Sequence, residues 1–153
     1  MHMLSIFSIF KRFLSSEQKK IIKGIPNLKN APMKILVCED DYMVVKAIEH
    51  KLTRDGYEVE IANDGKVASE MIRNNEYDLV ITDLLMPFTG GLEIINLMRN
   101  KLEKTTPMIV LSKVGNEETI IEAFKLGADD YLTKPFSPNE LSIRVKRFLI
   151  KKG

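Results

Sequence analysis

The chain has 153 residues, of which 44% are apolar and 29% charged, a balance typical of one folded domain with a full hydrophobic core. Its single cysteine excludes an internal disulfide, and its two histidines lie too far apart in the sequence to provide the ligand spacing of a zinc site. Residues 1–32 carry six Lys or Arg against one Glu, whereas residues 33–153 carry 17 basic and 20 acidic residues. The body of the chain therefore has no basic surplus that would indicate nucleic-acid binding.

The first 32 residues form an N-terminal extension and linker, separate from a domain at residues 33–153. Apolar residues recur at helical spacing over Met3–Leu14, but this run is too short to span a bilayer. A secretory signal is disfavoured because the positive charges follow the apolar run. Three interpretations stay open: a short amphipathic helix that packs on the domain or on a partner, a weak membrane anchor, and an extension without function that precedes a start at Met33. The membrane anchor is the least favoured of the three.

Five short apolar runs alternate with amphipathic stretches from Met33 onward. Several runs are apolar almost throughout, which is typical of parallel strands buried on both faces. The pattern predicts an α/β fold, a doubly wound five-stranded parallel sheet covered by five helices. The predicted strands are Lys34–Cys38, Tyr57–Ile61, Leu79–Thr82, Met108–Leu111 and Asp130–Thr133.

Capping residues mark the expected starts of the helices. Asp41, Asp64 and Asn116 are predicted N-caps of the first, second and fourth helices. Ser137–Glu140 has the pattern of a capping box, with Pro138 at the first helical position, so the last helix is expected to begin there.

Polar side chains follow four of the five predicted strands. In an open parallel sheet, ligands bind beyond the carboxyl ends of the strands, so these side chains are expected to converge at one edge. Clustered carboxylates repel one another unless a cation intervenes, and Mg²⁺ commonly takes carboxylates, waters and a phosphate oxygen. The pattern predicts a phosphoryl-transfer site in which Asp83 is the nucleophile, Ser112 donates a hydrogen bond and Lys134 balances charge. The acidic residues after the first strand are Glu39, Asp40 and Asp41.

Four segments resemble the receiver domain of two-component response regulators, over Met33 to about Lys152. The resemblance is closest to the receivers of winged-helix transcriptional regulators, and it implies a flavodoxin-like fold with strand order 2-1-3-4-5. The matching segments are MKILVCEDD, DLVITDLLMPFTGGLE, PMIVLS and LGADDYLTKPFSPNEL.

The resemblance also implies roles for individual residues. Asp83 is expected to accept a phosphoryl group from a sensor histidine kinase or a phosphotransfer protein. Mg²⁺ is expected to be held by Glu39, Asp40, Asp83 and the backbone carbonyl of Leu85. Ser112 and Tyr131 are the expected switch residues, Lys134 the phosphoryl contact, and the Lys134–Pro135 bond is expected to be cis.

Some residues depart from the usual pattern of the family. Lys113 follows the switch serine, where a small residue is more common. Leu85 is apolar and cannot orient an attacking water, which predicts slow self-dephosphorylation. Phe88 and Gly90 stand where Gly and Asp are usual, which predicts an altered loop with intact chemistry.

A homodimer through the fourth helix, fifth strand and fifth helix is a further expectation. Ile121 and Phe124 would supply an apolar patch, although Ile120 stands where this class usually has a basic residue. Charged residues at positions that match the interface of winged-helix regulators are Asp129, Asp130, Glu140 and Arg144.

The favoured function is a cytoplasmic response regulator that signals to a downstream protein and binds no nucleic acid itself, because no output domain follows Gly153. It is expected to be a phosphoacceptor rather than an enzyme. The alternative is an N-terminal receiver fragment of a DNA-binding transcriptional regulator. A Mg²⁺-dependent phosphatase is disfavoured by Leu85, and a degenerate docking module by the complete set of site residues.

Overall fold

The computed structural model describes residues 13–23, 31–113, 115 and 117–150, and it separates the chain into two units at residues 1–32 and 33–153. In the first unit, the helix α2 (Ser16–Lys23) begins with a reciprocal cap. Gln18 Oε1 accepts from the Ser15 amide at 3.0 Å, and Ser15 Oγ accepts from the Gln18 amide at 3.2 Å. No helix among the described residues is long and apolar enough to cross a bilayer.

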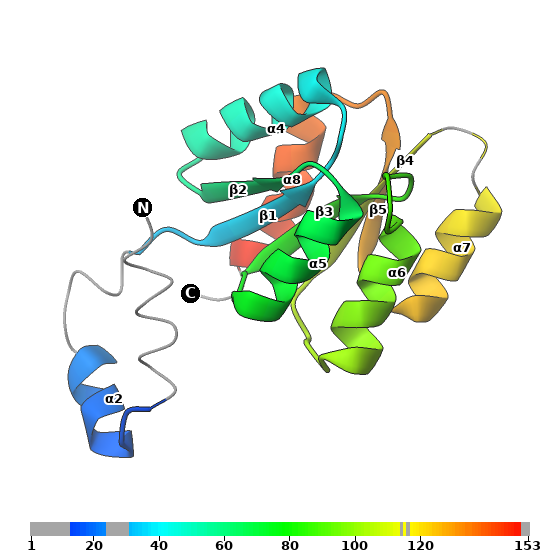
Figure 1. The fold of residues 1–153 in the computed structure, drawn as a ribbon. Helices are drawn as coiled ribbons and strands as arrows, with labels where there is room; N and C mark the ends of the chain where they lie inside the picture. Colours follow the sequence, from blue (N-terminus) through cyan, green and yellow to red (C-terminus); the bar gives the residue numbers. More distant parts are fainter. Residues whose placement is uncertain (1–12, 24–30, 114, 116, 151–153) are drawn as a thin grey trace. The chain divides into compact units, whose positions relative to one another are not determined.

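The second unit is built on a sheet of five parallel strands in the order β2-β1-β3-β4-β5 (Figure 1). This confirms the predicted fold class and strand order. The bounds are β1 (Lys34–Cys38), β2 (Glu58–Ala62), β3 (Leu79–Asp83), β4 (Met108–Lys113) and β5 (Asp130–Lys134). Relative to the prediction, β2 begins and ends one residue later, and β3, β4 and β5 extend further at their carboxyl ends.

Helices cover both faces of the sheet (Figure 1). On one face lie α4 (Tyr42–Arg54) and α8 (Pro138–Leu149), and on the other α5 (Gly65–Asn74), α6 (Gly91–Asn96) and α7 (Glu117–Leu126). A π-helical turn, η1 (Leu97–Lys101), continues α6. Among the described residues of this unit, the expectation of five helices is therefore met, with the third one ending in a wider turn that the sequence pattern did not indicate.

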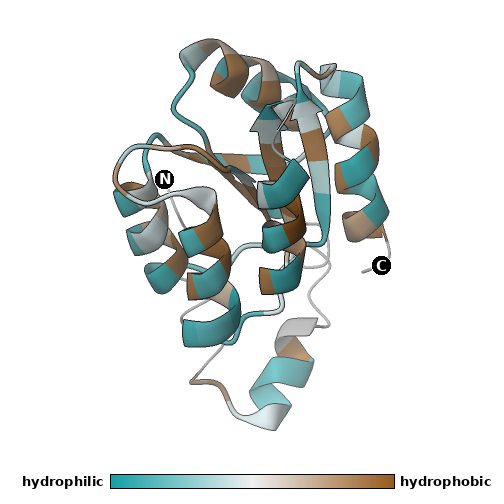
Figure 2. Ribbon diagram, turned by 90° about the vertical axis from the view of Figure 1, so that its right-hand side faces the viewer, coloured by the Kyte–Doolittle hydropathy of each residue, from teal (hydrophilic) through white to brown (hydrophobic). Residues whose placement is uncertain are grey.

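Successive residues of β1 point into two different cores, as the period of a strand requires. Ile35 and Val37 pack with α4 and α8, whereas Leu36 and Cys38 pack with α5 and α6. Figure 2 shows the hydrophobic strands enclosed between helices whose outer faces are hydrophilic. Both faces of the sheet are buried, which explains why the sequence of its central strands is almost uniformly apolar.

Three predicted helix caps are confirmed by hydrogen bonds. Asp41 Oδ1 accepts from the amides of Met43 and Val44, and Asp64 Oδ1 accepts from Val67 at 2.8 Å. Ser137 Oγ accepts from the Glu140 amide at 3.1 Å, so α8 begins at Pro138 as expected. Two predictions lie mainly or wholly outside the described residues. One is the helix pattern over residues 3–14, of which only Phe13 and Leu14 are described and neither is helical, and the other is the Asn116 cap.

Candidate functional site

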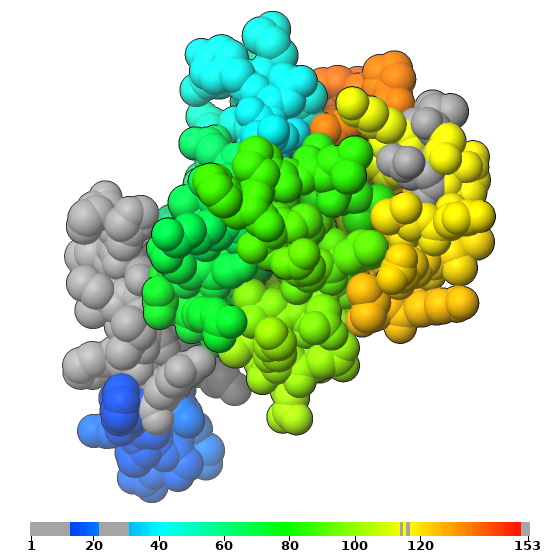
Figure 3. Space-filling view, turned by 45° about the vertical axis from the view of Figure 1, so that its right-hand side comes forward, coloured from blue at the N-terminus to red at the C-terminus, as the bar shows by residue number. Residues whose placement is uncertain are grey.

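The carboxyl ends of the strands bring the chemically active side chains to one edge of the sheet. Figure 3 shows the segments that follow β1, β3 and β5, in cyan, green and orange, gathered at the upper edge of the domain. Each polar residue sits there because the preceding strand is apolar and ends at the same level, as the register of β1 with β3 and of β4 with β5 shows.

Glu39 is the most buried member of the site, with no exposed surface. Its Oε1 accepts hydrogen bonds from the amides of Asp40 and Asp41, both at 3.1 Å. Its Oε2 accepts from Lys134 Nζ at 2.6 Å. Burial raises the pKa of Glu39 above its ordinary value, although Lys134 and the backbone amide of Asp41 act in the opposite direction.

Asp83 ends β3 and is buried apart from a small part of its carboxylate. Its Oδ2 accepts from Lys134 Nζ at 2.9 Å, and its Oδ1 accepts from the Leu85 amide at 3.4 Å. One ammonium group therefore contacts two carboxylates. Although burial alone lowers the pKa of Lys134, its bonds to Glu39 and Asp83 raise that pKa above the ordinary value, so the side chain is charged at neutral pH.

Three carboxylates can converge on one cation. Glu39, Asp40 and Asp83 each offer an oxygen, and these oxygens lie within 4.8 Å of one another. Asp40 is exposed, whereas the other two are buried. A set of oxygen ligands with room for water on the side of Asp40 suits Mg²⁺, which usually retains several waters. Lys134 contributes one positive charge against the three carboxylates, so a divalent cation would complete the balance.

Two expected site residues do not contact this cluster. Ser112 is buried at the end of β4, and its hydroxyl donates to the Lys113 carbonyl at 3.1 Å instead of to a carboxylate. Tyr131 is 39% exposed, and its ring meets that of Phe124 edge to face at 5.8 Å, on the outer surface. The Lys134–Pro135 bond is cis, as expected.

The loop after Asp83 is held by backbone contacts at two glycines, Gly65 and Gly91. The Gly91 amide donates to the Leu84 carbonyl at 3.0 Å, and the Gly65 amide donates to the Pro87 carbonyl at 3.2 Å. A Cβ at Gly91 would lie 2.4 Å from the Asp83 carbonyl oxygen, so only glycine allows this close approach. In the sequence, Gly91 is marked only by its place in the pair Gly90-Gly91. No local rule predicts its contacts with the backbone of Asp83 and Leu84.

Phe88, in the same loop, is 82% exposed and has φ of 70°. This left-handed conformation suits glycine, and a residue with a side chain adopts it at a cost of about 1–2 kcal/mol. The prediction of an altered loop shape stays a prediction.

Comparison with known proteins identifies the family. The model of the response regulator receiver domain matches residues 35–146. The chain belongs to this family. Receiver domains act as phosphoacceptors, bind Mg²⁺ at an acidic site and interact with histidine kinases and downstream targets.

Two similar relatives are transcriptional regulatory proteins. ResD of Bacillus subtilis is 39% identical over 116 residues, which cover 76% of this chain and 48% of ResD. SrrA of Staphylococcus aureus is 36% identical over 115 residues, which cover 75% of this chain and 47% of SrrA. This receiver chain spans about half the length of these two relatives.

Solved structures show the same fold. The receiver domain of the Francisella response regulator 1452 has a TM-score of 0.73 and 39% identity, and covers 79% of this chain and 99% of its own. The chemotaxis response regulator CheY4 of Vibrio cholerae has a TM-score of 0.72 and 32% identity, and covers 78% of this chain and 100% of its own. These neighbours confirm the flavodoxin-like receiver architecture.

Proposed function

We propose that Asp83 of this receiver accepts a phosphoryl group from a phosphohistidine of a sensor histidine kinase or a phosphotransfer protein. An Asp83 carboxylate oxygen would attack phosphorus as the bond from phosphorus to the imidazole nitrogen breaks, and the electron pair would stay on the imidazole. The observation that carries this proposal is the contact of Lys134 with both Glu39 and Asp83, at 2.6 and 2.9 Å. An ammonium at this position can stabilise the negative charge of the phosphoryl group as it approaches Asp83.

Glu39, Asp40 and Asp83, with the Leu85 carbonyl, would hold Mg²⁺ at this site. The bound cation would neutralise charge on the phosphoryl oxygens, as phosphoryl transfer generally requires. Glu39 and Lys134 would supply the remaining interactions. Glu39 is kept in place by two backbone amides, so it can orient a ligand without moving, and Lys134 can exchange its contact with Asp83 for a phosphoryl oxygen.

Ser112 and Tyr131 would be the switch residues, whose side chains change conformation when Asp83 is phosphorylated. In this structure the Ser112 hydroxyl bonds to the Lys113 carbonyl and Tyr131 lies outward against Phe124. Phosphorylation would favour a second conformation in which Ser112 donates to the phosphoryl group and Tyr131 turns inward. The two conformations are expected to coexist before phosphorylation, which shifts their populations.

The output surface would be formed by α7, β5 and α8, and a homodimer through it is part of the proposal. Ile121 and Phe124 are 54% and 41% exposed on α7, so an apolar patch is available. The charged residues nearby already have partners within the chain, since Arg144 binds Asp130 at 2.9 Å and Arg99 binds Asp129 at 2.8 Å. The apolar patch would therefore contribute more to dimerisation than charge pairing does.

We assign residues 33–153 to the receiver domain and residues 1–32 to an N-terminal extension and linker. The receiver would act in the cytoplasm as a phosphoacceptor without catalytic turnover, and would bind a downstream protein and no nucleic acid directly. A second candidate is the N-terminal receiver part of a DNA-binding transcriptional regulator. The observation that favours it is the match to about half the length of two transcriptional regulatory proteins, ResD and SrrA.

The test is incubation of the full chain with acetyl phosphate and Mg²⁺, followed by intact-mass measurement. A gain of one phosphoryl group that needs Mg²⁺ is expected in the wild type. Asp83→Asn should not gain it, and Asp40→Asn should need more Mg²⁺. No gain in the wild type, or an equal gain in Asp83→Asn, would contradict the proposal. Size-exclusion chromatography of the same samples, with Ile121→Glu as the variant, tests the dimer.

A further inference from the structure

Residues 1–32 carry a charge opposite to that of the receiver domain. Six Lys or Arg stand against Glu17 in this segment, a net charge of +5, whereas residues 33–153 carry 17 basic and 20 acidic residues, a net charge of −3. The phosphoacceptor site uses none of the six basic residues. An anionic surface would therefore attract this segment and repel the domain that follows it.

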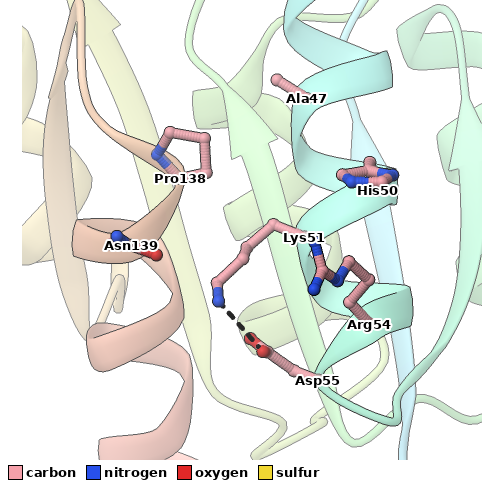
Figure 4. Close-up of a pocket in the computed structure, with 7 residues that line it drawn as sticks. All are labelled: Ala47, His50, Lys51, Arg54, Asp55, Pro138 and Asn139. Atoms are coloured by element: carbon pink, nitrogen blue, oxygen red, sulfur yellow. Dashed lines mark ion pairs between the residues drawn. The ribbon is translucent and has the colours of Figure 1, made fainter.

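Two lysines of α2 have no carboxylate partner among the residues that the structure describes. Lys19 and Lys20 are exposed, and neither forms an ion pair there with Glu17 or with another acidic residue. By contrast, Lys51 on α4 is neutralised within the chain, since it pairs with Asp55 at 3.2 Å, as the dashed line in Figure 4 shows. The charges of Lys19 and Lys20 are therefore available to an external partner.

Two apolar side chains of the same segment are exposed. Phe13, which precedes the Ser15 cap of α2, is 84% exposed, and Ile21, near the end of α2, is 69% exposed. Both side chains would gain free energy on leaving water for an apolar environment. Apolar surface and unpaired positive charge therefore occur together within the nine residues 13–21.

We propose that residues 1–32 bind the chain to a membrane surface that contains anionic lipids. Phe13 and Ile21 would enter the boundary between headgroups and acyl chains, and Lys19 and Lys20 would meet lipid phosphates. The eight residues of α2 extend about 12 Å, so this helix would lie along the surface without spanning it.

A lipid surface is favoured over an acidic protein because Phe13 and Ile21 are separated by polar residues and two lysines. A groove on a protein accepts apolar side chains gathered on one face of a helix, whereas a lipid boundary also accommodates lysines, whose stems lie among the acyl chains while the charges reach the phosphates. The proposal does not depend on phosphorylation of Asp83, and its test uses the unphosphorylated chain.

The test is sedimentation of the full chain with vesicles of phosphatidylglycerol and phosphatidylcholine in equal parts, and separately with vesicles of phosphatidylcholine alone. Binding is expected only to the first kind, and it should weaken as NaCl rises from about 0.05 to 0.5 M. Ile21→Ser should weaken binding about ten-fold, because less apolar surface leaves water. Lys19→Gln combined with Lys20→Gln should also weaken binding about ten-fold, because two charges near the lipid phosphates are lost.

Matched controls lie on the receiver domain. Ile143→Ser removes an isoleucine of α8 that is 68% exposed, and Lys101→Gln combined with Lys125→Gln removes two exposed charges, so both should bind vesicles like the wild type. Circular dichroism checks that each variant is folded. The chain has no tryptophan, so Phe13→Trp adds a single probe whose emission should shift to shorter wavelength when anionic vesicles are added.

Absence of binding to both kinds of vesicle, or equal binding to both, would overturn the proposal. Equal effects of Ile21→Ser and Ile143→Ser would overturn it as well. A synthetic acidic helical peptide tests for a protein partner, and binding of this peptide without binding of anionic vesicles would also contradict a membrane role.

Discussion

The ammonium of Lys134 lies 2.6 Å from Glu39 Oε2, and that carboxylate is completely buried. A buried carboxylate is costly unless a cation and hydrogen bonds compensate for lost hydration. Here the same ammonium also contacts Asp83, so one positive charge serves two carboxylates. Lys134 therefore offsets part of the negative charge of the two carboxylates, and the negative charge that remains favours a divalent cation.

Lys134→Met should lower the free energy of unfolding by about 3 kcal/mol at pH 7, because it leaves two carboxylates without their cation. Mg²⁺ should recover part of this loss. Lys113→Met is the control, since Lys113 is the neighbour of Lys134 in the β4–β5 register and is exposed. Urea unfolding of both variants, with and without Mg²⁺, measures the effect. Equal stabilities of the two variants would contradict the assignment of Lys134 as the compensating charge.

The loss of stability in Lys134→Met should depend on pH. The pKa of Glu39 is raised in the folded state, mainly by burial, so the folded form binds the proton more tightly than the unfolded chain does. Stability linked to this proton is present below the ordinary Glu pKa of about 4.3 and is lost as the pH rises through the raised value. Lys134 lowers the pKa of Glu39, so its removal should raise that pKa further. The difference in stability between Lys134→Met and wild type should therefore become smaller from pH 7 to about pH 5.

Local sequence rules predicted the features that depend on neighbouring residues. Asp41, Asp64 and Ser137 cap helices because a side-chain oxygen reaches an amide two or three residues on, and this is visible in the sequence. The convergence of Glu39 and Asp83 was also predictable, because parallel strands must end at one edge.

Features that depend on distant packing were not predictable. Arg99, on the π-helical turn, donates to the carbonyls of Gly127 and Lys104 and to Asp129, and it thereby joins the end of this helix to the segment before β5. No periodicity of residues 97–101 indicates these contacts. The start of α2 is a different case, since the Ser15–Gln18 capping box is a local signal in the sequence.

Ser142→Ala should lower stability by about 1–2 kcal/mol at neutral pH, because it removes the hydrogen bond that joins α8 to the end of α4 at Asp55. Partial burial alone would raise the pKa of Asp55, but the bond from Ser142 and the charge of Lys51 hold it below its ordinary value.

The stability that this carboxylate contributes is therefore present above the unfolded Asp pKa of about 3.9 and is lost as the pH falls through the lower folded value. The difference between wild type and Ser142→Ala in urea unfolding should be constant from pH 7 to pH 5 and decrease in stronger acid. A double-mutant cycle with Asp55→Asn isolates the pair, and a coupling energy of zero would rule out the interaction.

Gly91→Ala should destabilise the domain by about 1–3 kcal/mol and slow phosphoryl acceptance, because the new Cβ would meet the Asp83 carbonyl oxygen at 2.4 Å. Helix propensity alone favours alanine, so the direction of the change separates the two effects. Gly90→Ala is the adjacent control, with its nearest contact at 3.2 Å from the Leu84 carbonyl oxygen. In thermal unfolding, Gly91→Ala should have a lower Tm than Gly90→Ala. In acetyl phosphate labelling, it should gain the phosphoryl group more slowly.

Leu85 should make the phosphorylated state of Asp83 long-lived. Its amide donates to Asp83 Oδ1 at 3.4 Å, while its apolar side chain is 61% exposed beside the site and offers no group that could orient a water molecule. Leu85→Asn would supply such a group, and orientation of the attacking water should shorten the lifetime of the aspartyl phosphate by about ten-fold. Leu85→Met keeps the side chain apolar and should leave the lifetime unchanged. Decay of the phosphorylated protein after removal of acetyl phosphate, with Mg²⁺ held constant, measures all three chains. Equal lifetimes in wild type and Leu85→Asn would show that water reaches Asp83 without help from this position.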